Sequence, residues 1–174
     1  MRKSIVASLY ALNFTAATMA VIVFVGSRPA LFAPTDAPAR ITGRAEPIDG
    51  ETLEIGGRRI RLFGIDAPDR AQSCRDERGV GYACGRQATG ALQAKIGPRT
   101  VACDPRGADG LDLIPAVCRM GGENLNEWMV RQGWAVAARG EGRDYVRAEA
   151  EAKSERLGLW VGEFMSPADW RRRR

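Results

Sequence analysis

The sequence predicts an α+β fold, in which a small five-stranded Greek-key β-barrel carries about three packed helices and follows an N-terminal transmembrane helix. Three observations predict it. Short stretches of alternating apolar and polar residues are separated by glycine turns, later segments show helical spacing, and a long uncharged run lies near the N-terminus. With 174 residues and 45% apolar content, the chain is large enough for one packed domain with an appendage.

The first strands are expected in a hairpin soon after residue 41. Residues 52–55 and 59–65 alternate apolar and polar side chains on either side of Gly56-Gly57. This arrangement is typical of a β-hairpin. Asp49-Gly50 favours a further turn just before it.

A helix and two more strands are expected next. Residues 85–96 place apolar side chains at helical spacing and end at Gly97-Pro98. Residues 100–103 and 114–119 then favour strands, with Gly121-Gly122 as the following turn.

Two helices close the predicted order. Asn124 is a suitable cap for a helix over residues 125–131, and Gly158 is a suitable stop for one over residues 143–157. Strands, helix, strands and then two helices suit a Greek-key barrel of the OB type with helices packed on it.

Residues 1–27 favour a membrane anchor. Arg2 and Lys3 precede an uncharged run over residues 4–27, which is longer than the about 20 residues that a spanning helix needs. The apolar core of a secretory signal is usually only about 7–15 residues long, so an uncleaved anchor is favoured over a cleaved signal peptide. Residues 28–40 contain three prolines and are expected to form a tether.

Both interpretations of the N-terminus, anchor and signal peptide, predict that the domain over residues 41–170 is exported. An uncleaved anchor would hold it outside the cytoplasm, in the periplasm or at the cell surface, whereas cleavage would release it as a secreted protein. All four cysteines lie in the exported part, where disulfides can form. The four cysteines are Cys74, Cys84, Cys103 and Cys118, and they can form disulfides in three possible pairings. The local pairing joins Cys74 to Cys84 and Cys103 to Cys118. A zinc site is disfavoured because no pair has C-x2-C spacing.

The complete absence of histidine excludes several enzyme classes. Ser-His-Asp and Cys-His hydrolases, nucleases with histidine-bound metals and two-histidine metalloproteases all require it. An enzyme here must use carboxylates, arginines and an oxygen-bound metal.

The net charge of +5 comes from the two ends of the chain. Residues 41–169 contain 18 basic and 20 acidic residues, a balance of −2. The tail over residues 171–174 is four arginines, interpreted either as a solvated terminus or as a clamp for phosphate or lipid head groups.

Two neighbouring motifs carry the chemical signal. Asp49-Gly50-Glu51-Thr52 is followed by Arg61 and then by Asp66-Ala67-Pro68-Asp69. This order resembles the thermonuclease, or staphylococcal nuclease-like, family, which has an Asp-Gly-Asp-Thr turn before an Arg-x-x-x-x-Asp-x-Pro-Glu stretch. Later landmarks that also resemble the family extend the likeness over about residues 41–170; they are Cys84-Gly85, Leu125-Asn126, the stretch 129–135 and Gly158-Leu159-Trp160.

The resemblance implies a calcium-dependent site for cleaving nucleic acid. By their matching positions, Glu51 and Asp66 would hold the ion, Arg61 would bind the scissile phosphate, and Asp69 would orient or deprotonate the attacking water. The implied partner is DNA or RNA, and the protein is expected to be a monomer.

Three departures from the family pattern predict weak or lost activity. Glu51 stands for an aspartate and Asp69 for a glutamate, and displacing catalytic groups by roughly 1 Å can cost on the order of a hundredfold in rate. The family's second arginine is replaced by Leu113, which cannot donate a hydrogen bond to phosphate. The alternative function is a non-catalytic OB-fold module that binds nucleic acid, a protein or a cell-envelope component; an unrelated enzyme on the same barrel is a third hypothesis.

Overall fold

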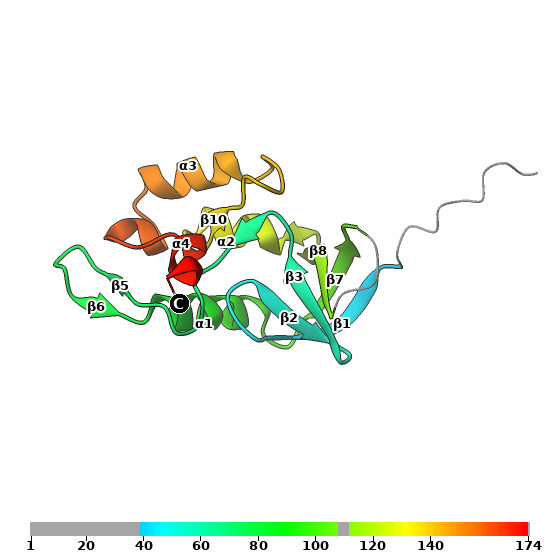
Figure 1. The fold of residues 1–174 in the computed structure, drawn as a ribbon. Helices are drawn as coiled ribbons and strands as arrows, with labels where there is room; N and C mark the ends of the chain where they lie inside the picture. Colours follow the sequence, from blue (N-terminus) through cyan, green and yellow to red (C-terminus); the bar gives the residue numbers. More distant parts are fainter. Residues whose placement is uncertain (1–38, 108–111, 174) are drawn as a thin grey trace, which may run out of the picture. The chain divides into compact units, whose positions relative to one another are not determined.

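The computed structural model describes residues 39–107 and 112–173, whose main sheet closes into a barrel (Figure 1). Among these residues the barrel has five strands, namely β1 (Ile41–Pro47), β2 (Thr52–Ile55), β3 (Arg58–Leu62), β7 (Thr100–Pro105) and β8 (Leu113–Met120). They lie in the order β3-β2-β1-β7-β8, and the parallel pairing of β3 with β8 closes the sheet. The predicted OB-type barrel is confirmed.

The β2–β3 hairpin forms as its alternating pattern predicts. Leu53 lies opposite Ile60 in the antiparallel register, and both side chains are fully buried in the barrel. The turn contains Gly56 and Gly57, both with positive φ, a conformation that costs glycine nothing. The expected second strand ends at Leu62, three residues early, because Phe63 and Gly64 form a turn before β4 (Ile65–Asp66).

Three helices agree with the expected segments, apart from their ends, namely α1 (Cys84–Ile96), α2 (Leu125–Arg131) and α3 (Val146–Ser154). The sequence did not predict the 3-10 helix η1 (Gly158–Val161) or the C-terminal helix α4 (Pro167–Arg172). Asn124 caps α2 as predicted, since its side chain accepts hydrogen bonds from the backbone N–H groups of Asn126 and Glu127. The helix expected over residues 143–157 is shorter at both ends: buried Tyr145 precedes its first residue, and Arg156 has a positive φ that a continuing helix does not allow.

Most buried side chains belong to one large core, inside the barrel and beneath α1 and α2. Buried Asn126 ties this core to the turn after β3: its Nδ2 donates to the carbonyls of Phe63, at 2.8 Å, and Ala116, at 3.0 Å. Its Oδ1 accepts the Cys118 N–H at 3.0 Å. A buried amide with all three of these partners fixes the turn relative to β8.

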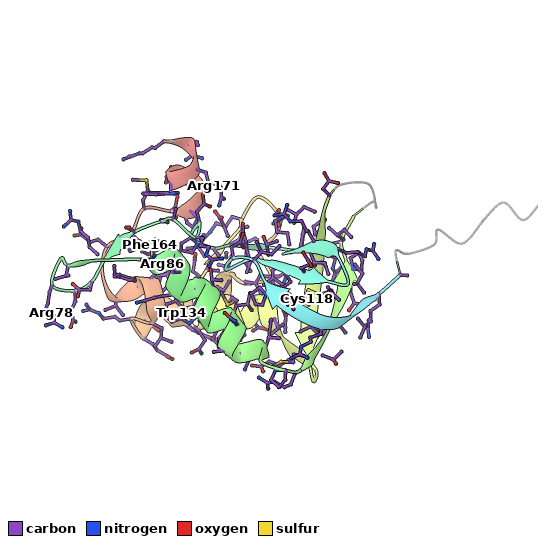
Figure 2. The ribbon with its side chains drawn as sticks, turned by 90° about the horizontal axis from the view of Figure 1, so that it is seen from below. Arg78, Arg86, Cys118, Trp134, Phe164 and Arg171 are labelled. Carbon is purple, nitrogen blue, oxygen red and sulfur yellow. A yellow bond between two sulfur atoms is a disulfide. The ribbon has the colours of Figure 1, made fainter. Side chains whose placement is uncertain are left out.

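A second, smaller group of buried residues lies outside the barrel. This satellite core contains Cys74, Cys84 and Leu159, with Tyr82 and Phe164 packed against it. It joins the short hairpin of β5 (Cys74–Arg75) and β6 (Gly81–Tyr82) to the segment that follows α3. Figure 2 shows Phe164 near the first turn of α1, whereas Cys118 lies among the barrel strands.

Both disulfides follow the local pairing. Cys103–Cys118 links β7 to β8, where the two residues are opposite each other in register, and Cys74–Cys84 links the β5–β6 hairpin to the start of α1. The sequence left the pairing open, and the strand register decides it.

The predicted anchor, residues 1–27, and nearly all of the tether over residues 28–40 lie outside the described residues. Over residues 39–107 and 112–173, no helix combines the length and apolar character needed to cross a bilayer.

Candidate functional site

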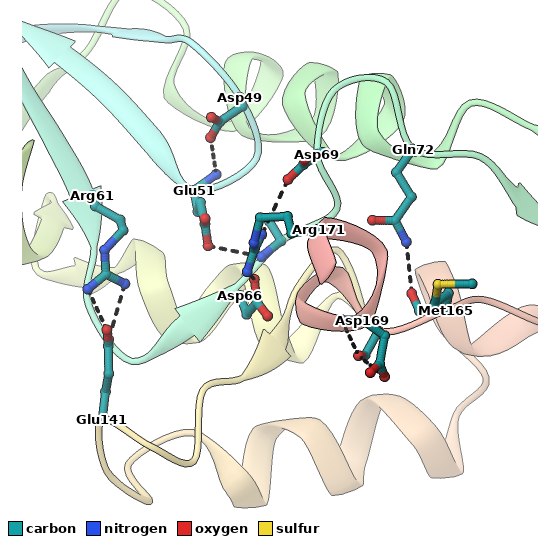
Figure 3. Close-up of polar contacts among 12 residues, drawn as sticks. Asp49, Glu51, Arg61, Asp66, Asp69, Gln72, Glu141, Met165, Asp169 and Arg171 are labelled. Atoms are coloured by element: carbon teal, nitrogen blue, oxygen red, sulfur yellow. Dashed lines mark hydrogen bonds and ion pairs between the residues drawn. The ribbon is translucent and has the colours of Figure 1, made fainter. Parts of the chain in front are cut away.

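The site begins at the turn between β1 and β2, where Asp49 shapes the backbone. Its Oδ1 accepts the N–H groups of Glu51, at 2.9 Å, and Thr52, at 2.7 Å. An aspartate that binds backbone groups two and three residues ahead stabilises such a turn. Asp49 is therefore used for structure, and Glu51 is the acid that the turn presents to the site (Figure 3).

Glu51 is held by the loop that carries the other acids. Its Oε2 accepts the Ala67 N–H at 3.1 Å. Burial raises the pKa of Glu51 to about 7, and the negative charges of Asp66 and Asp49 add to that rise. The Ala67 hydrogen bond and the positive charge of Arg171 oppose it. Near neutral pH, Glu51 therefore exchanges readily between its neutral and charged forms, and a bound cation would favour the charged one.

Asp66 and Asp69 follow the turn after β3 and are fixed from two sides. β4, which contains Asp66, pairs with β10 (Val136–Ala137), and Val136 lies opposite Asp66. Asp69 is fixed by α1, since a Cβ on Gly85 would lie only 1.8 Å from the Asp69 carbonyl oxygen. Glycine is therefore needed at the first turn of α1, which explains the predicted Cys84-Gly85 landmark.

Arg61 projects from β3 and forms an ion pair with Glu141. Its Nη1 and Nη2 donate to the two Glu141 carboxylate oxygens, at 3.1 Å and 2.5 Å. The Gly64 N–H donates to the same carboxylate at 2.7 Å. The Arg61 fork and the Gly64 N–H thus make up an anion site of the shape that a carboxylate or a phosphate fills.

The second guanidinium in the site comes from the C-terminal helix. The Nη2 atom of Arg171 donates to Asp66 Oδ1 at 2.6 Å, and its Nη1 donates to Asp69 Oδ1 at 3.3 Å (Figure 3). Burial alone would lower the pKa of Arg171, but its hydrogen bonds to the two aspartates and the charge of Glu51 outweigh that effect and raise it. Arg171 and Arg172 belong to α4, whereas the sequence interpretation set residues 171–174 apart as a basic tail.

Leu113 lies in β8 at the predicted degenerate position. It is partly buried and lies opposite Arg59 in the parallel register, while Pro115 lies opposite Arg61. Its apolar side chain offers no hydrogen-bond donor. The guanidinium that reaches the acids is instead Arg171, on the other side of Glu51 in Figure 3.

The structure therefore brings the four predicted site residues to one edge of the barrel: Glu51, Arg61, Asp66 and Asp69. It adds Glu141 and Arg171, which sequence reasoning missed. Both lie far from their partners in sequence, 80 and 105 residues away respectively, so no local motif contained them.

The donors present suit a hard divalent cation with incomplete protein coordination. Over residues 39–107 and 112–173, no three Asp, Glu, Cys or His side chains surround a common point closely enough to hold a metal by themselves. Glu51 and Asp66 nevertheless offer carboxylate oxygens, and calcium accepts such oxygens together with carbonyls and waters. That Asp66 and Asp69 bind a guanidinium shows that this edge attracts positive charge.

The barrel and this edge define a class of protein, an OB-fold domain with an acid-and-arginine site. The chain belongs to the family described as staphylococcal nuclease homologue, whose pattern matches residues 59–162. The resemblance predicted from the motifs is confirmed.

Similar proteins come from several organisms. The chain is 38% identical, over 69% of its length, to a succinoglycan biosynthesis protein, ExoI, of Rhizobium meliloti, and the match spans 64% of that protein. It is 32% identical to a protein named ParB of Escherichia coli, over 72% of this chain and 75% of that one. It is 30% identical to an uncharacterized endonuclease of Haemophilus influenzae, over 71% and 68%.

Proposed function

We propose that this protein is a calcium-dependent phosphodiesterase that cleaves DNA or RNA internally, with a weakened catalytic set. The observation that carries the proposal is the meeting of three acids and Arg61 at one edge of the barrel. Two relatives whose names contain the word endonuclease support it, one from Haemophilus influenzae and one, named as probable, from Schizophyllum commune.

Each side chain has a role that its surroundings support. Glu51 and Asp66 would hold the divalent ion, which supplies positive charge next to the phosphate when bound. Arg61 would exchange Glu141 for a phosphate oxygen pair, because the fork geometry suits both anions. Asp69, partly exposed at the rim of the site, would orient the attacking water and accept its proton.

The weakening follows from Leu113 and from the changed lengths of two acids. Leu113 supplies no guanidinium where the family has one, so less of the charge that builds up in the transition state is offset at that position. Glu51 and Asp69 differ from the family's residues by one methylene each, in opposite directions. The missing arginine and the shorter Asp69 would lower the rate of cleavage, and the longer Glu51 would also change how the metal is held.

Plasmid degradation by the full-length protein, with calcium and with a chelator, tests the proposal. We expect slow cleavage with calcium and none with chelator. Arg61→Gln should lower the rate by about 10²–10³-fold, as for the loss of one transition-state donor. Arg147→Gln is a matched control, because that arginine is 91% exposed on α3. Equal rates for Arg61→Gln and the control would contradict the assignment.

A second function is a non-catalytic binding module, favoured by Leu113 and by the Glu141 carboxylate in the Arg61 fork. It predicts no cleavage with any divalent ion and a ligand whose affinity survives chelation. The combined change Glu51→Asp, Asp69→Glu and Leu113→Arg distinguishes the two functions. If only the changed protein cleaves DNA, the module is supported; if the unchanged protein cleaves equally fast, the departures do not weaken the site.

We also propose that the domain acts outside the cytoplasm, anchored by residues 1–27 or secreted after their removal. Two disulfides in the described part of the chain support this, because such bonds persist in oxidising compartments. Protease treatment of spheroplasts, together with assay of the culture medium, tests the location: an anchored exported domain is degraded, a secreted one is found in the medium, and a cytoplasmic one is protected.

A further inference from the structure

The C-terminal helix α4 carries a positive charge onto the acids of the site. The helix is held at its start by Ser166, whose Oγ accepts the Asp169 N–H at 3.1 Å, and by Pro167, which is buried. The two arginines of the helix have different partners: Arg172 pairs with Asp169 of the same helix, while Arg171 reaches Asp66 and Asp69. The contact of Arg171 is therefore specific to that residue and not a general effect of the arginine tail.

Arg171 binds the same oxygen atoms that a divalent cation needs. The Asp66 side chain is only 14% exposed and that of Asp69 only 28%, while Arg171 remains 42% exposed. A calcium ion on Asp66 would lie within about 2.3–2.6 Å of a carboxylate oxygen, where Arg171 Nη2 now lies 2.6 Å from Oδ1. The two cations cannot share that oxygen without strong repulsion in a partly buried place.

We infer that Arg171 determines the metal requirement of this site, because its guanidinium competes with the divalent cation for Asp66 and Asp69. The inference rests on the proposed function for the identity of the cation. Without metal, α4 neutralises the acids and closes the site; with metal, Arg171 leaves Asp66 and the helix is held less firmly.

The competition works in both directions. If Arg171 lowers the affinity of the site for calcium by some factor, calcium weakens the docking of α4 by the same factor. A merely structural Arg171 would behave differently, since its loss would loosen the acids and weaken metal binding. The direction of the change in calcium affinity therefore separates competition from support.

Calorimetric titration of the full-length protein with calcium measures that direction. We expect Arg171→Gln to bind calcium about three- to tenfold more tightly than the unchanged protein, as for the removal of a partly exposed ion pair. Arg171→Lys keeps the charge without the fork and should fall between them. Arg172→Gln is the matched control, because it lies next in the same helix and should leave the affinity unchanged.

Hydrogen exchange supplies a second readout that does not depend on cleavage. Saturating calcium should speed exchange at the backbone amides of α4 in the unchanged protein and have no such effect in Arg171→Gln. Equal or weaker calcium binding by Arg171→Gln overturns the inference, as does the absence of calcium binding in both proteins. Calcium binding without plasmid cleavage would overturn the proposed phosphodiesterase activity and leave the competition standing.

Discussion

The large core and the satellite core hold the two sides of the site in different ways. The large core fixes Glu51 and Arg61 on a turn and a strand of the barrel, and Asp66 on the adjoining β4; the inward-facing residues of these elements are almost completely buried. The satellite core has only three fully enclosed members among the described residues, and the chain leads from it to α4 and Arg171. The acidic residues are thus positioned by the part of the fold that is costly to deform. Arg171, the cation that pairs with them, is positioned by a part that moves at lower cost.

The largest expected change in stability comes from removing the disulfide in the large core, and it can be compared with removal of the disulfide in the satellite core. Replacing Cys103 and Cys118 by alanine should lower the free energy of unfolding by about 3 kcal/mol, the value expected for a closed loop of this length. Denaturant titration of the oxidised proteins measures it.

Replacing Cys74 and Cys84 by alanine sharpens the same comparison. Because this bridge joins only the hairpin and α1, we expect its loss to speed hydrogen exchange over residues 74–82 and 158–164, with a smaller change in global stability. A global loss equal to that of the barrel pair would mean that both cores unfold as one unit.

An intermediate effect concerns Glu149, which joins α3 to the barrel side. Burial alone would raise the pKa of Glu149, but hydrogen bonds from Arg139 and the Ala137 N–H, together with the charge of Lys153, outweigh it and lower it. A carboxyl whose pKa is lower in the folded state stabilises the fold above its unfolded pKa, and this contribution is lost as the pH falls through the folded value.

Glu149→Gln should therefore lower stability by about 1–3 kcal/mol at pH 7, with the difference from the unchanged protein shrinking below about pH 4. Unfolding by denaturant at a series of pH values measures it. A difference that stays constant down to acidic pH would show that packing, and not the charge of Glu149, is responsible.

The smallest expected effect concerns the loop partner of Arg61. Glu141→Gln removes the charge that competes with phosphate, so KM for plasmid should fall about threefold while kcat is unchanged, the signature of altered ground-state binding. Oligonucleotide binding by fluorescence polarisation should tighten by the same factor. Glu155→Gln, at the exposed C-terminal end of α3, is the control. Weaker binding by Glu141→Gln would indicate that Glu141 positions Arg61 for the substrate.

Local chemistry in the sequence determined the barrel and most of its elements. Alternation on either side of Gly56-Gly57 is enough to specify a hairpin, and the capping residue Asn124 is enough to begin α2. The Asp49 turn and the short distance from Arg61 to Asp69 likewise put the acids and one arginine near each other on consecutive elements. These features depend on residues a few positions apart, and so a single sequence contains them.

Only the tertiary structure decided which charges meet across the site. Arg171 reaches Asp66, 105 residues away in sequence, and Glu141 reaches Arg61, 80 residues away. The disulfide pairing was settled in the same way, by the register of β7 against β8. Such contacts depend on how α4 and the loop before α3 dock against the barrel, and no periodicity or turn motif encodes the position of a docked segment. The charge of a residue can be known from sequence, but its partner is known only once the chain has folded.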